Sequence, residues 1–128
     1  MSRHEGRVQA VQVLFSHYYT PLSFNQIENF KDLIEKPLSE FSLELIKNTL
    51  IELPVIDDKI KSLAKNWKFD RIHSIDLSIL RLAIFELMFL KTPKKIVIDE
   101  YLIIAKDFST EDAYRFINGI LDSPNLLK

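Results

Sequence analysis

The chain has 128 residues, of which 47% are hydrophobic and 27% charged, and its 17 basic and 18 acidic residues give a net charge of −1. This length and composition are typical of one compact domain covering residues 1–128. The absence of cysteine excludes disulfides and thiolate metal sites, and the near-neutral total charge indicates no polyanionic partner by itself.

The five prolines divide the chain into segments of helical length, because proline is tolerated at helix starts and in turns. Ser23 is a typical N-cap for a helix ending near Glu35, Ser39 suits the next helix, and Pro54 suits the first turn of another. Apolar residues at helical spacing predict the inward faces. These are Val8, Val11, Leu14, Phe15 and Tyr18 in the first helix (about 3–18), Leu43, Ile46, Leu50 and Leu53 in the third, and Ile56, Ile60, Leu63 and Trp67 in the fourth.

From Arg71 to Leu90 the sequence is apolar on nearly every side, which predicts the buried central helix of a bundle. Helices over about 95–108 and 110–122 follow, the second with Ser109 or Thr110 as its N-cap. No alternating pattern of strands competes. The sequence therefore predicts an all-α fold of about seven helices around one long buried central helix. It contains no segment typical of a signal peptide or a membrane span, so we expect a cytoplasmic protein.

Charged residues are segregated along the chain. Residues 28–58 hold eight acidic and three basic side chains, whereas residues 59–71 hold five basic side chains and one acidic one. Charges segregated in this way can form a local basic patch on the surface. Alternatively, the charged side chains merely face water on the outer sides of helices. Composition alone favours the second interpretation.

No arrangement of residues predicts catalysis, a metal site or a cofactor. The three histidines lack the spacing of metal ligands, and two glycines are too few for a loop that cradles phosphates. We therefore expect a protein that is not an enzyme. Three charged residues within apolar stretches are expected to find buried partners, namely Arg81, Glu86 and Glu100.

Gly119 lies inside the apolar helical pattern "AYRFINGILDS" (113–123), where a glycine costs about 1 kcal/mol relative to alanine. A helix C-cap would account for it. Close packing of a second helix would also account for it, and we favour this interpretation because Ile120 and Leu121 continue the apolar spacing beyond the glycine.

Cations lie near both ends of the chain, and on the last helix one of them is next to an aromatic residue. Arg3, His4 and Arg7 belong to the first helix or precede it, and Arg115 lies beside Phe116 on the last helix. Sites for single-stranded RNA use this combination, since a cation holds phosphate while a ring stacks on an unpaired base. Spacing alone favours the alternative that Phe116 is a core residue. The RNA interpretation requires that the outer faces of the first and last helices lie side by side.

Three motifs then resemble the NusB family of bacterial transcription antitermination factors. They are "RVQAVQVLF" (7–15), "DLSILRLAIFEL" (76–87) and "PKKIVIDEYLIIAKDFSTEDAYRFINGILD" (93–122). The resemblance implies two packed helical subdomains. It also implies a partner, the small-subunit ribosomal protein NusE, with which such proteins bind the single-stranded boxA element of nascent ribosomal RNA. Other Nus factors and RNA polymerase complete the antitermination complex.

The resemblance also assigns roles to individual residues. The residues implied to face RNA are Arg3, His4, Arg7, Asp112, Arg115 and Phe116. Those implied to face NusE are Phe15, Tyr18 and Asp76. Two of them have alternatives: Asp112 either accepts a hydrogen bond from a base or simply stabilises the start of its own helix, and Phe15 fits the core equally well.

The N-terminal arm departs from the family pattern, because the dense arginine run of many members is reduced here to Arg3, His4 and Arg7. Fewer phosphate contacts predict weak RNA binding by the protein alone, with NusE supplying much of the affinity. The same departure supports an alternative function, an all-α interaction or dimerisation module without RNA binding. Some relatives form homodimers, and the sequence leaves monomer and homodimer both open.

Overall fold

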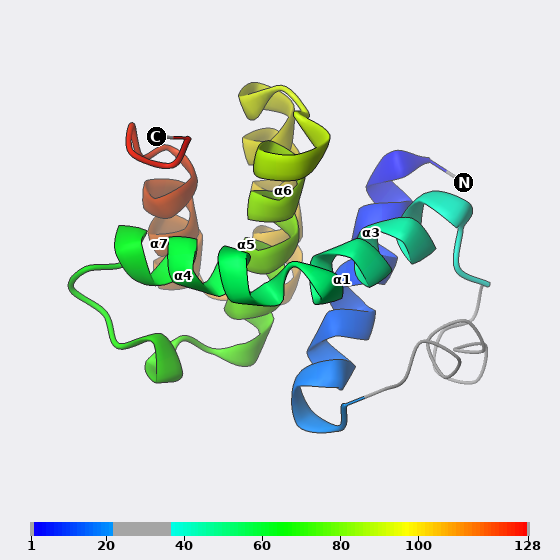
Figure 1. Ribbon diagram of the computed structural model, residues 1–128, viewed down its shortest axis with the longest axis horizontal. Coiled ribbons are helices and arrows are strands. Elements are labelled where there is room, and N and C mark those ends of the chain that lie inside the picture. Colours follow the sequence, from blue (N-terminus) through cyan, green and yellow to red (C-terminus); the bar gives the residue numbers. More distant parts are fainter. Residues whose placement is uncertain (1, 22–36, 128) are drawn as a thin grey trace.

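The computed structural model describes residues 2–21 and 37–127, in which the regular structure is entirely helical (Figure 1). Six α-helices occur in these residues: α1 (Arg3–Tyr19), α3 (Glu40–Ile51), α4 (Leu53–Leu63), α5 (Ser74–Phe85), α6 (Lys94–Phe108) and α7 (Glu111–Leu121). The all-α prediction is confirmed. The helix predicted from Ser23 to about Glu35 lies outside the described residues. No described helix is long and apolar enough to cross a membrane.

Local signals in the sequence set the helix starts. The Ser39 hydroxyl accepts a hydrogen bond from the Ser42 amide at 3.1 Å, and the Thr110 hydroxyl accepts one from the Ala113 amide at 3.1 Å. Each bond satisfies one of the amides that a helix start leaves without a partner. Pro54 lies in the first turn of α4, where its missing amide hydrogen costs nothing. Both predicted caps and the proline start are therefore confirmed.

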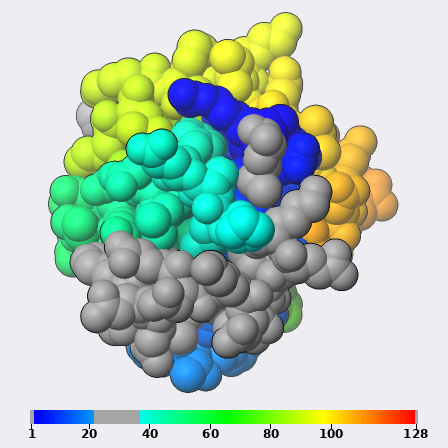
Figure 2. All heavy atoms as spheres, turned by 90° about the vertical axis from the view of Figure 1, so that its right-hand side faces the viewer, coloured from blue at the N-terminus to red at the C-terminus, as the bar shows by residue number. Residues whose placement is uncertain are grey.

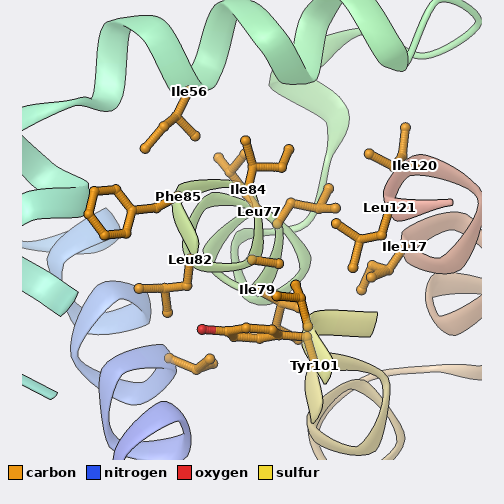
Figure 3. Packing of buried hydrophobic residues seen from close by; sticks show 14 of the residues in the cluster. Ile56, Leu77, Ile79, Leu82, Ile84, Phe85, Tyr101, Ile117, Ile120 and Leu121 are labelled. Atoms are coloured by element: carbon orange, nitrogen blue, oxygen red, sulfur yellow. The ribbon is translucent and has the colours of Figure 1, made fainter. Parts of the chain in front are cut away.

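The central helix α5 is buried along almost its whole length and is shared by two groups of helices. α1 and α3 pack against it on one side, and α4, α6 and α7 pack around the rest of it. Figure 3 shows Leu77 and Ile84 of α5 among Ile56 of α4 and Ile117 of α7. The helix is shorter than predicted, since Arg71 belongs to a separate 3-10 turn (Phe69–Arg71) and residues Glu86–Leu90 form a π-helical turn.

Three predicted inward faces differ from the observed ones. On α1, Phe15 and Tyr18 are exposed rather than inward. On α3 the buried residues are Ser42, Leu45, Ile46 and Thr49, while Leu43 and Leu50 are only half-buried. α3 uses this face because its serine packs closely against α1, as described below. Beyond α4, Trp67 is 59% exposed rather than inward, because the helix ends at Leu63 and its spacing no longer applies.

Close packing at a glycine occurs at Gly6 and not at Gly119, for which it was predicted. Gly119 lies inside α7 and is exposed, and a β-carbon built on it would have no neighbour within 4 Å among the described residues. It is therefore neither a C-cap nor a point of close packing, and both interpretations were wrong. Close packing occurs at Gly6 instead, where a β-carbon would lie 3.0 Å from the Phe41 ring and 3.1 Å from the Ser42 hydroxyl. Gly6 thus lets α3 approach α1.

Candidate nucleic-acid interface

The outer faces of α1 and α7 do not lie side by side. α1 packs on α3 and α5, α7 packs on α5 and α6, and Figure 1 shows α5 and α6 between them. The prediction was wrong because the buried α5 lies between the first and last helices. The residues assigned by resemblance therefore fall on separate surfaces: the start of α1, the end of α1 and the exposed face of α7.

At the start of α1, most of the predicted cations are engaged within the fold. The Arg3 guanidinium is exposed and lies 4.7 Å from the centroid of the Phe41 ring of α3. The His4 ring is hydrogen-bonded to the Glu100 carboxylate of α6. Figure 2 shows these first residues (dark blue) between the start of α3 (cyan) and the start of α6 (yellow). Among the described residues at the start of α1, Arg3 alone is left as an exposed cation.

Arg7 is buried, with 3% of its surface exposed, in a network centred on Glu86. Its Nε and Nη2 donate to the two Glu86 carboxylate oxygens at 2.7 and 2.9 Å. The hydroxyls of Tyr101 and Thr92 donate to the same carboxylate at 2.5 and 3.1 Å. The hydrogen bond to Glu86 raises the pKa of Arg7, and burial raises the pKa of Tyr101 well above its ordinary value. The resemblance implied an RNA-facing Arg7; the structure makes it a buried ion-pair partner.

The expected partners of buried charges are present. Glu86 pairs with Arg7, and Arg81 donates two hydrogen bonds of 2.9 Å to the Asp57 carboxylate. Glu100 pairs with His4 and is half-buried. Among the described residues, no group of three histidine or acidic side chains is placed to hold a metal ion.

The exposed face of α7 carries the other residues assigned to RNA. Asp112 and Arg115 are exposed, and Arg115 donates a hydrogen bond of 3.2 Å to Glu111 one turn earlier. Phe116 is half-buried, so it contributes to the core and still has an accessible edge. At 100° per residue, Gly119 lies on the same face as these three residues.

A hollow of about 260 Å³ opens beside Phe116. The ring of Trp67 lies there with its centroid 5.0 Å from that of Phe116 and its plane tilted by 59°. Sequence reasoning missed this contribution, because the apolar spacing assigned Trp67 to the core. The basic surplus in residues 59–71 was the available signal. The hollow is lined by Trp67, Arg71, Ile72, His73, Asp76, Thr110, Asp112, Ala113 and Phe116.

The end of α1 forms an aromatic surface. Phe15 and Tyr18 are 37% and 44% exposed, and each ring meets the edge or face of Tyr19, with centroids 5.3 and 5.2 Å apart. Phe15 is therefore not a core residue. The Tyr19 hydroxyl is hydrogen-bonded to the Ser74 hydroxyl at 2.8 Å, which joins this surface to the start of α5.

Asp76, the third residue assigned to the protein partner, is only 4% exposed. It lies in the first turn of α5, and its carboxylate accepts a hydrogen bond of 2.6 Å from the Ser109 hydroxyl. This bond joins α5 to the turn between α6 and α7. Asp76 also lines the hollow beside Phe116.

Comparison with known proteins gives consistent matches along the chain. Residues 4–125 match the NusB family. The chain is 41% identical to the transcription antitermination protein NusB of Staphylococcus carnosus, over 98% of this chain and 100% of the relative. The structure of T. maritima NusB has a TM-score of 0.81 and 31% identity, over 95% of this chain and 89% of that one. A chain in the crystal structure of the antitermination factors NusB and NusE in complex with dsRNA has a TM-score of 0.75 and 25% identity, over 94% of this chain and 95% of that one.

Proposed function

Because this chain belongs to the NusB family, we propose that it is a transcription antitermination factor that binds the boxA element of nascent ribosomal RNA together with NusE. The observation that carries this proposal is the 41% identity to a named antitermination protein over the full length of that relative. The bound factors join RNA polymerase with other Nus factors and allow it to read through terminators. This function is one of binding rather than catalysis, and it belongs in the bacterial cytoplasm.

For RNA we propose the exposed face of α7, with Arg3 as a more distant phosphate contact. Arg115 would hold phosphate, and the accessible edge of Phe116 would contact an unpaired base. Asp112 would accept a hydrogen bond from the amino group of a base, which adds specificity at some cost in affinity because the carboxylate repels phosphate. His4 and Arg7 are not included, since their side chains are already paired with Glu100 and Glu86.

For NusE we propose the aromatic surface at the end of α1, made of Phe15, Tyr18 and Tyr19. Exposed aromatic side chains are enriched at protein interfaces because they bury a large area at a low cost in conformational entropy. Asp76 would contribute mainly by holding the turn between α6 and α7 through its hydrogen bond with Ser109, and only little by direct contact with NusE.

An interaction module without RNA binding is the second candidate. It is favoured by one observation, that a single exposed cation remains of the three predicted at the start of α1. The discriminating experiment is a titration of boxA RNA and of a scrambled RNA, each with and without NusE, over a range of salt concentrations.

We expect the protein alone to bind boxA weakly and with a shallow salt dependence, because few phosphates are neutralised. Adding NusE should tighten the binding and restore the preference over the scrambled RNA. Tight and steeply salt-dependent binding by the protein alone would contradict the assigned set of contacts. Equal binding of both RNAs in the presence of NusE would favour the interaction module.

Tyr18→Ala should weaken the binding of NusE by about 1–2 kcal/mol, roughly 5- to 30-fold, because an exposed aromatic contact is lost. Isothermal titration of NusE in the absence of RNA measures this. Ile96→Ala is the matched control, since Ile96 is 45% exposed at the start of α6, away from the end of α1 (Figure 1). Equal losses for the two variants would argue against the aromatic surface as the site.

A further inference from the structure

The α5–α6 turn (residues 86–93) leaves two large apolar side chains exposed. Phe89 and Leu90 are 40% and 46% exposed, and they are the last residues of the π-helical turn that follows α5. The Phe89 ring stacks on the buried Phe85 ring, with centroids 5.4 Å apart and planes inclined by 20°. The core therefore holds one face of Phe89 while the rest of the side chain stays accessible. Exposed apolar side chains that are close together are typical of protein interaction sites.

The backbone of this turn is strained at Lys91. This residue has φ 57° and ψ 30°, in the left-handed region, and among the described residues no other non-glycine residue has a positive φ. Glycine is strongly preferred at such a position after a helix, because a β-carbon raises the energy of the left-handed conformation. π-helical turns are rare and occur frequently at functional sites. The side chain of Lys91 therefore explains its presence better than its backbone does.

Buried contacts hold the turn in this conformation. The Glu86 carbonyl accepts hydrogen bonds from the amides of Lys91 and Thr92, the second at 3.1 Å. The Glu86 carboxylate accepts from Arg7, Tyr101 and Thr92 in the network described above. Side chains on a rigid backbone lose less conformational entropy when they bind a partner. The α5–α6 turn is thus a preorganised surface.

The charge around the two exposed apolar side chains is positive. Lys91 and Lys95 are exposed, and neither forms an ion pair with a described residue. Lys94 is half-buried, and its ammonium lies 3.8 Å from the carboxylate of the exposed Asp122. Residues 87–98 contain no acidic residue. An apolar surface bordered by cations complements a partner that carries apolar and acidic side chains.

This surface lies away from the end of α1 and from the hollow beside Phe116, both of which adjoin the start of α5. Figure 1 shows the α5–α6 turn at the top of the molecule, whereas the start of α5 and the end of α1 lie at its lower side. Asp76 and Glu86 are ten positions apart, which is about 15 Å along a helix. A partner at the turn can therefore bind while NusE and RNA are bound.

We propose that the α5–α6 turn binds an acidic, apolar protein segment on the RNA polymerase elongation complex. Phe89 and Leu90 contact apolar side chains of that segment, and Lys91 and Lys95 pair with its carboxylates. The proposal rests on the proposed function and deepens it, because it assigns to one surface the contact by which the protein joins the polymerase.

Two other occupants are disfavoured by the same residues. RNA is disfavoured because Leu90 and Pro93 offer no aromatic face for a base, and no exposed side chain of residues 89–95 can accept a hydrogen bond from one. A second copy of the chain is disfavoured because a two-fold contact would place Lys91 and Lys95 of both copies together, where like charges repel.

The first experiment measures how tightly the full chain, bound to NusE, is retained by purified RNA polymerase elongation complexes that carry boxA RNA and the other Nus factors. Leu90→Ser and Lys91→Glu should each weaken retention on the order of 10-fold. Both variants should bind boxA RNA with NusE as the wild type does when the polymerase is absent. Ile103→Ser is the matched control, since Ile103 is 49% exposed on α6, and it should be retained as the wild type is.

A second experiment tests the chemistry of the surface without the polymerase. A labelled helical peptide of leucine and glutamate is titrated with the free full chain, and its fluorescence anisotropy is measured. A counterpart with lysine in place of glutamate is titrated in the same way. We expect the glutamate peptide to bind more tightly than the lysine peptide, and Lys91→Glu should abolish the difference because it reverses a charge at the surface.

Lys91→Gly separates a binding role from a structural one. Glycine should raise the Tm, because it adopts the left-handed conformation without strain. The same substitution should weaken retention by the elongation complex, because a cation is lost. A residue with a structural role alone would not change stability and retention in opposite directions. Thermal unfolding and the retention assay measure the two effects.

The outcomes separate this inference from the function on which it rests. If the wild-type protein with NusE shows no preference for boxA, the proposed function fails, and the peptide titration still tests the surface. If Leu90→Ser and Lys91→Glu are retained as the wild type is, the inference is overturned while the proposed function stands. If both variants lose boxA binding when the polymerase is absent, the turn belongs to the RNA site and the inference is overturned. Equal binding of the two peptides to the wild type would also overturn it.

Discussion

Arg7→Ala should destabilise the protein by about 3–5 kcal/mol, which is a large part of the stability of a domain of this size. The substitution leaves the Glu86 carboxylate, which has 0% exposed surface, without the guanidinium that balances its charge. The hydroxyls of Tyr101 and Thr92 remain as donors but carry no positive charge. Urea unfolding followed by circular dichroism measures the effect as a lower transition midpoint.

Two further variants show whether the charge itself is the cause. In the double variant Arg7→Met with Glu86→Gln, the amide oxygen still accepts from Tyr101 and Thr92 while both charges are gone. This variant should recover much of the lost stability, because no unpaired charge is left in the interior. Arg3→Ala, one helical turn before Arg7, should change stability by less than about 0.5 kcal/mol because Arg3 is exposed. A stable Arg7→Ala variant that had lost only RNA binding would restore the assignment that the resemblance implied.

Helix starts were predictable because their causes are local. The hydroxyls of Ser39 and Thr110 each accept a hydrogen bond from the amide three residues later. Pro54 lies in the first turn of α4, where its lack of an amide hydrogen leaves no helical hydrogen bond unmade. The burial of α5 was also predictable, since a segment that is apolar on every side has no face suited to water. These signals act over one or two helical turns, within the range that a single sequence reveals.

Contacts between distant residues were not predictable in the same way. Arg7 was assigned to an RNA-facing surface by the resemblance, yet it is buried against Glu86, which lies 79 positions away. Trp67 was assigned to the core by extending the spacing of α4 beyond Leu63, where the helix ends. The resemblance to the NusB family identifies which positions correspond, but it does not show whether the side chain at each position is exposed. His4 is an example, because its ring is hydrogen-bonded to the Glu100 carboxylate.

Valine at each glycine should separate the two roles that the structure assigns to them. Gly6→Val should destabilise the protein by about 3 kcal/mol, because even the β-carbon would lie 3.0 Å from Phe41 Cδ2, 3.1 Å from Ser42 Oγ and 3.2 Å from Ser39 Oγ. The same approach carries the hydrogen bond of 2.6 Å from the Ser42 hydroxyl to the Gly6 carbonyl, which would also be strained. Thermal unfolding measures the loss as a lower Tm.

Gly119→Val is the matched variant. It should leave stability unchanged or raise it by a few tenths of a kcal/mol, since valine is the better helix former and no described residue lies within 4 Å of the added β-carbon. A glycine that weakens its helix without a packing reason is expected where another molecule approaches the backbone. Because Gly119 shares the face of Asp112 and Phe116, the branched side chain should weaken boxA binding in the presence of NusE. A marked loss of stability in Gly119→Val would instead mean that α7 has a packing partner at this position, and the exposed face would then no longer be available to RNA.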